Sequence, residues 1–513
     1  MPSNLAVRSA GGAAVRRRCT RRLRQPPSEV FVVIPGPVRE LPPRRRGTAC
    51  GFAMTTRLLA AAAVAAFSAL GTAALTAAGA RAQLTDAALQ SPPGAADATS
   101  GGGEIRSRLD GAAPLTVDDE RLHASLLQKF YAAHAWAPVW PSHPQQAAAL
   151  IGAVMRAGEQ GLDPALFHAA LLRNLAALSP IDRELVLSDA FLAYADALAR
   201  GALPIEDRSD DEDLAPAPVD VGAALDAAIA SPDPASVIVA LAPSSPEYLA
   251  LRRALAEARA MPEAARAAAR ERTLEVNLER LRWLPRRLPP DRVWVNAANA
   301  RLVLDRGDFP IFTTRVIVGE VDKQTPEFQA TIDSVLFNPP WNIPPSIATK
   351  EILPKLSLDP DYLVEHDMIW RRPGALQQVA GPHSALGRLK FEMTDRFDVY
   401  LHDTPEHFLF ARRDRRRSHG CVRIEDPRLL AALLLDEPVA EINQSIAQEG
   451  THRRYLKTPM PVFIVYQTAV AEPDGRIAFL PDVYDRDPEI WQRLHPSEQA
   501  PIAEHEPPGQ RPG

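Results

Sequence analysis

Cysteine is scarce in this chain, with only three among 513 residues. Cys19 and Cys50 lie within the first 53 residues, so Cys421 stands alone in the remainder. A lone cysteine excludes an intramolecular disulfide there and also excludes the paired Cys/His spacing of structural zinc sites. The sequence lacks a Gly-rich phosphate-binding loop as well, so we expect neither a metal nor a nucleotide cofactor.

Negative charge outnumbers positive charge outside the start of the chain. Residues 1–82 hold thirteen arginines and two glutamates, a charge of +11, which leaves −16 for the remainder of a chain of net charge −5. So acidic a remainder is a poor partner for nucleic acid. Residues 1–53 themselves could form a basic nucleic-acid arm, but an extension upstream of the true start at Met54 is favoured.

Residues 54–82 have the layout of a secretory signal. Arg57 precedes an apolar run from Leu58 to about Ala78, and the small residues Ala80-Arg81-Ala82 resemble a cleavage site. A transmembrane anchor is the competing interpretation, because the run is close to the length that spans a bilayer. In both cases we expect an exported protein, and after removal of a signal it would be peripheral to the membrane at most.

The next segments predict a linker and then a helical scaffold. Residues 83–114 are rich in Gly, Ala, Ser, Asp and Pro and indicate a flexible linker. Over residues 115–270, apolar side chains recur at helical spacing and Pro/Asp-rich breaks separate the runs. The histidines of this region show no ligand spacing, and we expect surface or packing roles for them: His123, His134, His143 and His168.

The spacing of apolar residues changes near Leu274, from a helical period to the two-residue alternation of strands. One helix over 271–284 leads into predicted strands at 292–296, 301–304 and 312–318, followed further on by 397–401 and 422–424. The sequence thus predicts an α+β protein, with an all-helical domain at 115–270, a β-rich domain at 271–470 and a tail at 471–513.

One stretch of the β-rich domain carries the elements of a reactive thiol. His402 is followed, after fifteen residues, by Ser418-His419-Gly420-Cys421-Val422-Arg423. The thiolate is the nucleophilic form of cysteine, and an imidazole can take the thiol proton near neutral pH. We therefore predict Cys421 as nucleophile and His402 as general base. His419 is expected to shape the turn or contact substrate, with a role as alternative base left open.

The residues next to Cys421 also have expected roles. Gly420 permits close backbone approach, so the N–H groups of Gly420 and Cys421 are expected to form an oxyanion hole. Ser418 is expected to orient His402 or the loop. Arg423 fits a substrate carboxylate or a structural ion pair equally well. Five arginines within 412–417 form either a solvated surface or a cationic patch that attracts an anionic substrate and favours the thiolate.

These motifs resemble the active-site signature of the L,D-transpeptidase family (YkuD-type catalytic domain). The resemblance extends to other blocks of the large periplasmic members that carry a helical scaffold and a capping subdomain. Those blocks are NLERLRWL at 277–284, Val316–Gly319 with Thr325-Pro326, 338–348, Ala385-Leu386-Gly387 and Leu401–Pro405.

The resemblance implies a periplasmic enzyme that acts on peptidoglycan stem peptides, without a cofactor and with other cell-wall synthesis proteins as further partners. Cys421 would form a thioester with a donor tetrapeptide, release D-Ala and make a 3→3 cross-link. An L,D-carboxypeptidase, a protein-to-wall linkage by the same cysteine and a non-catalytic wall-binding scaffold are the alternatives. The insertion at 341–386 would be the capping subdomain, in which Trp341 contacts substrate or simply packs.

Overall fold

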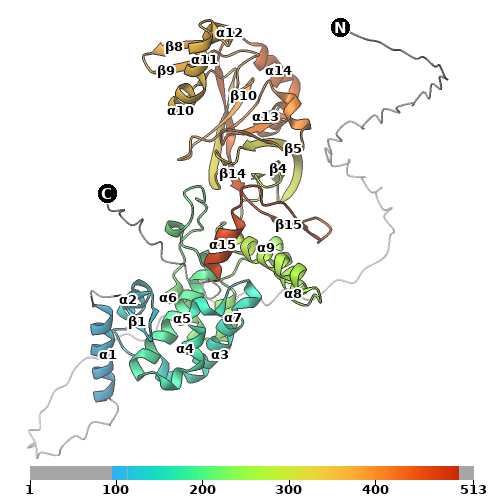
Figure 1. Cartoon of the computed structure of the whole chain (residues 1–513). Coiled ribbons are helices and arrows are strands. Elements are labelled where there is room, and N and C mark those ends of the chain that lie inside the picture. The colour runs from blue at the N-terminus through green and yellow to red at the C-terminus, as the bar shows by residue number, and fades with distance from the viewer. Residues whose placement is uncertain (1–94, 112–113, 496–513) are drawn as a thin grey trace, which may run out of the picture. The chain divides into compact units, whose positions relative to one another are not determined.

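The computed structural model describes residues 95–111 and 114–495, and it separates into two compact units (Figure 1). One unit contains the helices up to Arg287, without residues 209–213, together with the segment from Thr468 to the end of the described chain. The other contains residues 209–213 and 288–467. This helical unit and this β-rich unit confirm the predicted α+β class. The predicted extension 1–53 and secretory signal 54–82 lie outside the described residues.

The helical unit is organised around one long buried helix, α5 (Pro180–Arg200), whose residues are buried on nearly every face. Pro180 opens this helix, Ser179 caps it by accepting the Asp182 N–H, and Gly201 ends it at a φ of 97°. The other long helices of the unit are α2 (Ala124–Ala133), α3 (Pro144–Met155), α6 (Val221–Ile229), α7 (Pro234–Val239), α8 (Pro246–Arg259) and α9 (Ala264–Arg282).

Three sequence-based boundaries are wrong. The predicted linker contains α1 (Ala95–Leu109), in which Ile105 and Leu109 lie four residues apart and are buried. The last predicted helix begins at Ala264 rather than 271 and belongs to the helical unit, so the β-rich unit starts near residue 288.

The third error concerns the predicted tail. It folds as far as residue 495, forming a hairpin, β15 (Ala469–Ala471) with β16 (Ile477–Phe479), and then α15 (Asp487–Leu494). Polar bonds hold this segment against α9: Arg280 pairs with Asp487 at 2.5 Å, and His495 bonds Glu275 at 2.8 Å.

The β-rich unit is built on one large sheet of nine strands. Their order is β12-β5-β13-β11-β10-β6-β14-β3-β4, and a further pairing of β4 with β5 closes eight of them into a ring. The strands are β3 (Arg292–Asn296), β4 (Arg301–Arg306), β5 (Phe309–Gly319), β6 (Phe328–Phe337), β10 (Leu389–Met393), β11 (Leu401–His402), β12 (Arg416–Ser418), β13 (Val422–Ile424) and β14 (His452–Val465).

Alternation of side chains positions the core of this sheet. Along β6 the residues are alternately buried and exposed, so every second side chain points into the ring. The predicted strand 397–401 is shorter than expected, because Asp398 adopts a left-handed φ of 54° and leaves only Leu401–His402 in the ladder.

The predicted insertion 341–386 forms a subdomain with its own small core. A three-stranded sheet, β7 (Trp341–Asn342), β9 (Ala375–Gln378) and β8 (Met368–Arg372), lies with three short helices, α10 (Pro345–Ile347), α11 (Leu353–Leu358) and α12 (Tyr362–Glu365), and a π-helical segment at Ala348–Ile352 (Figure 1). Its core residues are Ile343, Ala348, Ile352, Met368 and Leu376. We call this subdomain the cap.

No helix of the described residues is both long and apolar enough to cross a bilayer.

A buried ion pair is the most exacting polar contact of the helical unit. Glu279 and Arg282 of α9 are both fully buried and lie 2.9 Å apart. Glu279 also accepts hydrogen bonds from the Leu203 N–H at 2.9 Å and the Trp283 indole at 3.1 Å. Arg282 completes its contacts with the Gln160 carbonyl and the Tyr248 hydroxyl.

We expect Glu279→Gln to lower the free energy of unfolding of the helical unit by about 3–5 kcal/mol, because it leaves the buried Arg282 charge without its counter-ion. Urea unfolding followed by circular dichroism measures this. The control is Glu271→Gln, which breaks the half-exposed Arg259–Glu271 pair and should cost less than about 1 kcal/mol. Equal losses in the two variants would contradict the assignment.

Candidate active site

Two parallel strands bring the predicted nucleophile and base together. In the β11–β13 pair Leu401 is opposite Val422 and His402 is opposite Arg423, and the Val422 N–H donates to the Tyr400 carbonyl at 3.1 Å. Side chains two residues apart on a strand share a face. By this register, His402 and Cys421 belong to the same face of neighbouring chain segments, one pleat apart.

The turn that presents Cys421 is held by hydroxyl groups. Gly420 has a φ of 108°, a conformation that only glycine adopts readily. The Ser418 hydroxyl donates to the Cys421 carbonyl at 2.6 Å and accepts the Gly420 N–H at 3.2 Å. The buried hydroxyl of Thr325, which lies between β5 and β6, donates to the Gly420 carbonyl at 2.8 Å.

These bonds refine two expectations from the sequence. Ser418 orients the loop rather than His402. The Gly420 N–H donates to Ser418, so in this state it is not free to serve an oxyanion, and the Cys421 N–H remains the donor of the expected pair. Formation of a two-donor oxyanion hole would require the Ser418 bond to exchange.

A backbone carbonyl sets the tautomer of His402. The buried imidazole lies with Nδ1 2.5 Å from the Asp403 carbonyl, which can only accept, so Nδ1 carries the proton and Nε2 keeps its lone pair. The Asp403 carboxylate is fixed in turn by the Arg388 and Thr404 N–H groups, each at 2.8 Å. Gly387 permits this contact, because a Cβ there would lie 2.5 Å from the carboxylate.

Electrostatics favour a neutral pair in the resting site. Burial, followed by the nearby Arg423 and Lys390 charges, lowers the pKa of His402 to about 3. Cys421 is partly exposed as a residue, but its sulfur is buried, and this burial raises the pKa of the thiol. Hydrogen bonds from Tyr400 and the charge of Lys390 lower that pKa by less. Both directions favour the neutral forms, a thiol and an imidazole, and the sequence cannot reveal how strongly both groups are desolvated.

The sulfur has partners other than His402. Among the described residues the imidazole does not hydrogen-bond the thiol. The sulfur lies 3.9 Å from the Asp398 carbonyl and accepts hydrogen bonds from the hydroxyl and the backbone of Tyr400. The Tyr400 ring lies edge-on to the His402 ring, with centroids 5.6 Å apart. Hydrogen bonds to a catalytic base are often formed only when substrate is bound.

Trp341 reaches this site from the cap through Tyr400. Its side chain hydrogen-bonds Tyr400, and burial, with the Cys421 charge, raises the pKa of the Tyr400 phenol. The Lys390 ammonium lies 4.2 Å from the Tyr400 ring centroid, and Lys390 pairs with His402 in the β10–β11 ladder. The predicted residue Trp341 therefore belongs to the site, with Tyr400 between it and the sulfur.

His419 and Arg423 make contacts that leave them poorly placed as bases or free cations. His419 Nε2 lies 2.6 Å from the Glu351 carboxylate of the cap, and Lys323 binds the same carboxylate at 3.0 Å. Burial raises the pKa of the Glu351 carboxyl, but the contacts with His419 and Lys323 outweigh burial, so the net shift of this pKa is downward. Arg423 forms an ion pair with Glu406 at 2.5 Å, which is the structural ion pair among its two predicted roles.

The arginine-rich loop does not form one cationic patch. Arg415 is half-buried and donates to the backbone carbonyls of Val316, Asn299 and Ala300. Arg416 pairs with Asp414 at 2.9 Å. Of the five arginines, Arg412, Arg413 and Arg417 are exposed, whereas the two half-buried arginines make contacts within the protein.

Sequence reasoning missed Tyr400 and Lys390 as members of the site. Tyr400 was detectable, because it lies two residues before His402 and must share its face if the strand prediction holds. Lys390 had no such signal, since only the β10–β11 register brings it to His402.

We expect alkylation of Cys421 by iodoacetamide to be slow at pH 7 and to accelerate about tenfold per pH unit up to the raised pKa, because the thiol stays protonated below it. Peptide mass mapping separates Cys421 from Cys19 and Cys50, which serve as internal references. A rate that already levels off below pH 8 would contradict the neutral pair.

Tyr400→Phe should raise the pKa of the Cys421 thiol further, by about 1–2 units, because it removes a hydrogen bond that favours the thiolate. Thiolate absorbance against pH, in a variant lacking Cys19 and Cys50, measures this shift. The matched control is Tyr455→Phe, at an exposed tyrosine of the same unit. An unchanged pKa in Tyr400→Phe would show that this hydroxyl does not act on the sulfur.

Comparisons with known proteins agree with this geometry. Residues 290–464 match the family described as the L,D-transpeptidase catalytic domain, and residues 125–255 match the Scaffold domain. A Haemophilus influenzae protein named "Putative L,D-transpeptidase" is 35% identical over 240 residues, which cover 42% of this chain and 48% of that protein. The chain thus spans about half the length of this curated relative.

A solved structure described as "Structure of the Ldtfm-avibactam carbamoyl enzyme" covers 34% of this chain and 49% of that chain, at 10% identity and a TM-score of 0.18. So low a score supports no argument about this chain. The two domain matches do, and they place His402 and Cys421 inside the matched catalytic segment. The chain therefore carries a Scaffold domain followed by a catalytic domain of the L,D-transpeptidase family.

Proposed function

We propose that this protein is a peptidoglycan L,D-transpeptidase that uses Cys421 as its nucleophile and makes 3→3 cross-links between meso-diaminopimelate residues. The observation that carries the proposal is the Asp403 carbonyl, which holds the proton of His402 on Nδ1. This leaves Nε2 as a base on the face of the sheet that also bears Cys421. Family membership supplies the reaction class, and this arrangement supplies the residues.

The first half-reaction transfers an acyl group to the enzyme. As the sulfur attacks the carbonyl between the third residue and the terminal D-Ala, its proton passes to Nε2 of His402. The resulting imidazolium then protonates the departing amine, so D-Ala leaves and the third residue remains as a thioester of Cys421. In the second half-reaction the side-chain amine of another stem attacks this thioester, and the sulfur recovers a proton through His402.

A neutral resting pair suits this sequence of steps. The low pKa of His402 keeps Nε2 unprotonated across the physiological range, so the base is always available. The Lys390 charge and the Tyr400 bonds stabilise negative charge on the sulfur as it develops. Proton transfer would then accompany attack on a bound substrate instead of preceding it, which protects an exported thiol from adventitious oxidation.

The cap is suited to exclude water from the thioester. Its own core keeps it folded, and its Glu351 bonds His419, the residue two positions before the nucleophile. A transferase depends on such exclusion, because water competes with the acceptor amine. We propose that the protein works in the periplasm after export, where peptidoglycan stem peptides and other cell-wall synthesis proteins would be its partners.

The test is incubation of the protein with disaccharide tetrapeptide, followed by mass spectrometry of the products. We expect a cross-linked dimer that lacks one D-Ala, no product from Cys421→Ala, and a rate reduced by about 10²–10⁴-fold in His402→Gln. The control is His366→Gln, an exposed histidine of the same unit, which should stay active.

Other outcomes separate the remaining possibilities. Tripeptide as the sole product would replace the proposal with an L,D-carboxypeptidase, and transfer only to a protein amine would replace it with protein-to-wall linkage. Unchanged substrate for both the parent chain and Cys421→Ala would leave a non-catalytic wall-binding scaffold.

A further inference from the structure

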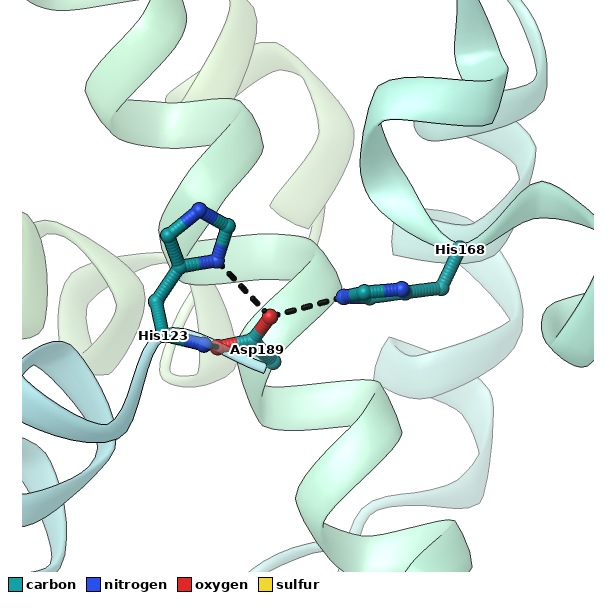
Figure 2. A group of neighbouring side chains, drawn as sticks. All are labelled: His123, His168 and Asp189. Atoms are coloured by element: carbon teal, nitrogen blue, oxygen red, sulfur yellow. Dashed lines mark hydrogen bonds and ion pairs between the residues drawn. The ribbon is translucent and has the colours of Figure 1, made fainter. Parts of the chain in front are cut away.

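Three polar side chains from distant parts of the helical unit converge on one point (Figure 2). His123 lies at the start of α2, His168 lies directly before α4 (Ala169–Arg173), and Asp189 lies in the middle of α5. His123 Nδ1 is 2.9 Å and His168 Nε2 is 2.7 Å from the same oxygen, Oδ2 of Asp189. Among the described residues, this is the one group of three or more His, Cys, Asp or Glu side chains with converging ligand atoms.

The outer atoms of the cluster are also held in place. Oδ1 of Asp189 accepts the His123 backbone N–H at 2.8 Å, which directs Oδ2 toward the two rings. Nδ1 of His168 lies 2.6 Å from the Glu120 carboxylate, which directs Nε2 toward Asp189. In metal sites, a ligating histidine commonly donates its other ring N–H to a carboxylate, and this fixes both the tautomer and the ring orientation.

The backbone at His168 supports a specific placement of its ring. His168 has a φ of 58°, a left-handed conformation that is uncommon for residues with a side chain. The side chain that this conformation directs inward is almost fully buried, at 5% exposed, and Asp189 is fully buried. A buried carboxylate requires compensation by cations or hydrogen-bond donors.

Protons provide this compensation when no ion is present. Without an ion, the imidazoles of His123 and His168 both lie within hydrogen-bond distance of Oδ2 of Asp189. A cation placed among the three ligand atoms would take over the role of these protons. Binding would then release protons, so affinity must rise with pH.

The distances allow an ion after a small movement. Two ligands on a tetrahedral zinc ion with bonds of roughly 2.0–2.1 Å are separated by roughly 3.3 Å. The present 2.7 and 2.9 Å separations are therefore short by about half an ångström. The His123 side chain is 52% exposed and can rotate outward, and it borders a pocket of about 320 Å³ that offers an ion and a water molecule a route.

We propose that His123, His168 and Asp189 form a binding site for a divalent transition-metal ion of the zinc class, with Glu120 orienting His168 and water as the fourth ligand. The ion links the start of α2, the turn before α4 and the centre of α5. Two imidazoles and one carboxylate suit zinc and its neighbours, whereas calcium and magnesium prefer oxygen ligands. The site is independent of the cysteine chemistry and of the function proposed above.

The test is zinc binding by the full chain in which Cys19, Cys50 and Cys421 are replaced by serine, so that no thiol competes for the ion. Isothermal titration at pH 7.5, with metal content measured after desalting, should give one zinc per chain. His123→Asn should weaken binding at least about 100-fold, and Glu120→Gln should weaken it about 10–100-fold. Affinity for the parent chain should increase from pH 6 to pH 8.

The matched control is His134→Asn. His134 also faces a carboxylate, Asp226 at 2.9 Å, but has no third ligand, so zinc binding should be unchanged. His123→Asn decides the outcome because its half-exposed side chain can be replaced without disturbing the fold, which circular dichroism verifies. Absence of zinc from the parent chain, or equal affinity in His123→Asn, would overturn the proposal and leave a hydrogen-bonded charge cluster only.

Discussion

The pairing of β11 with β13 is the constraint on which the rest of the active site depends. It aligns Tyr400 with the nucleophile turn and His402 with Arg423, so that base, nucleophile and the phenol beside them share one face of the sheet. The hydroxyls of Ser418 and Thr325 then fix the turn, and the Asp403 carbonyl fixes the imidazole. Each of these groups acts on residues whose positions the strand pairing has already determined.

Desolvation gives this arrangement its chemical character. A cysteine and a histidine in water would exchange a proton readily near neutral pH, but here burial disfavours both charged forms. The raised pKa of Cys421 therefore favours the thiol form in this site. Lys390 and the Tyr400 hydroxyl become effective when negative charge develops on the sulfur, which is the point at which electrostatic stabilisation accelerates a reaction.

The motif was predictable because chemistry and local structure coincide there. The sequence predicts His402 at the end of one strand and Cys421 directly before another, and β11 and β13 lie at these positions. That the two strands are neighbours comes from the structure. Asp403 acts through its backbone carbonyl, and a carbonyl has no sequence signature. The ion pair of His419 with Glu351 joins residues 68 positions apart, and only the folded cap brings them together.

The helical unit illustrates the same limit. Apolar periodicity predicted its helices, but Gly- and Ser-rich composition hid α1, whose buried Ile105 and Leu109 are its principal apolar signal. His123 and His168 were expected to have separate surface or packing roles, and Asp189 was not singled out, because three residues on three different elements have no regular spacing. Tertiary packing around α5 creates their proximity.

The central claim is that Cys421, with His402 as its base, is the acylated nucleophile. Intact-mass and peptide-mapping analysis after incubation with a carbapenem tests it most directly. The account predicts one adduct, mapped to Cys421, that forms far more slowly in His402→Gln and not at all on Cys19 or Cys50. An unmodified Cys421, or acylation at the same rate without His402, would contradict it.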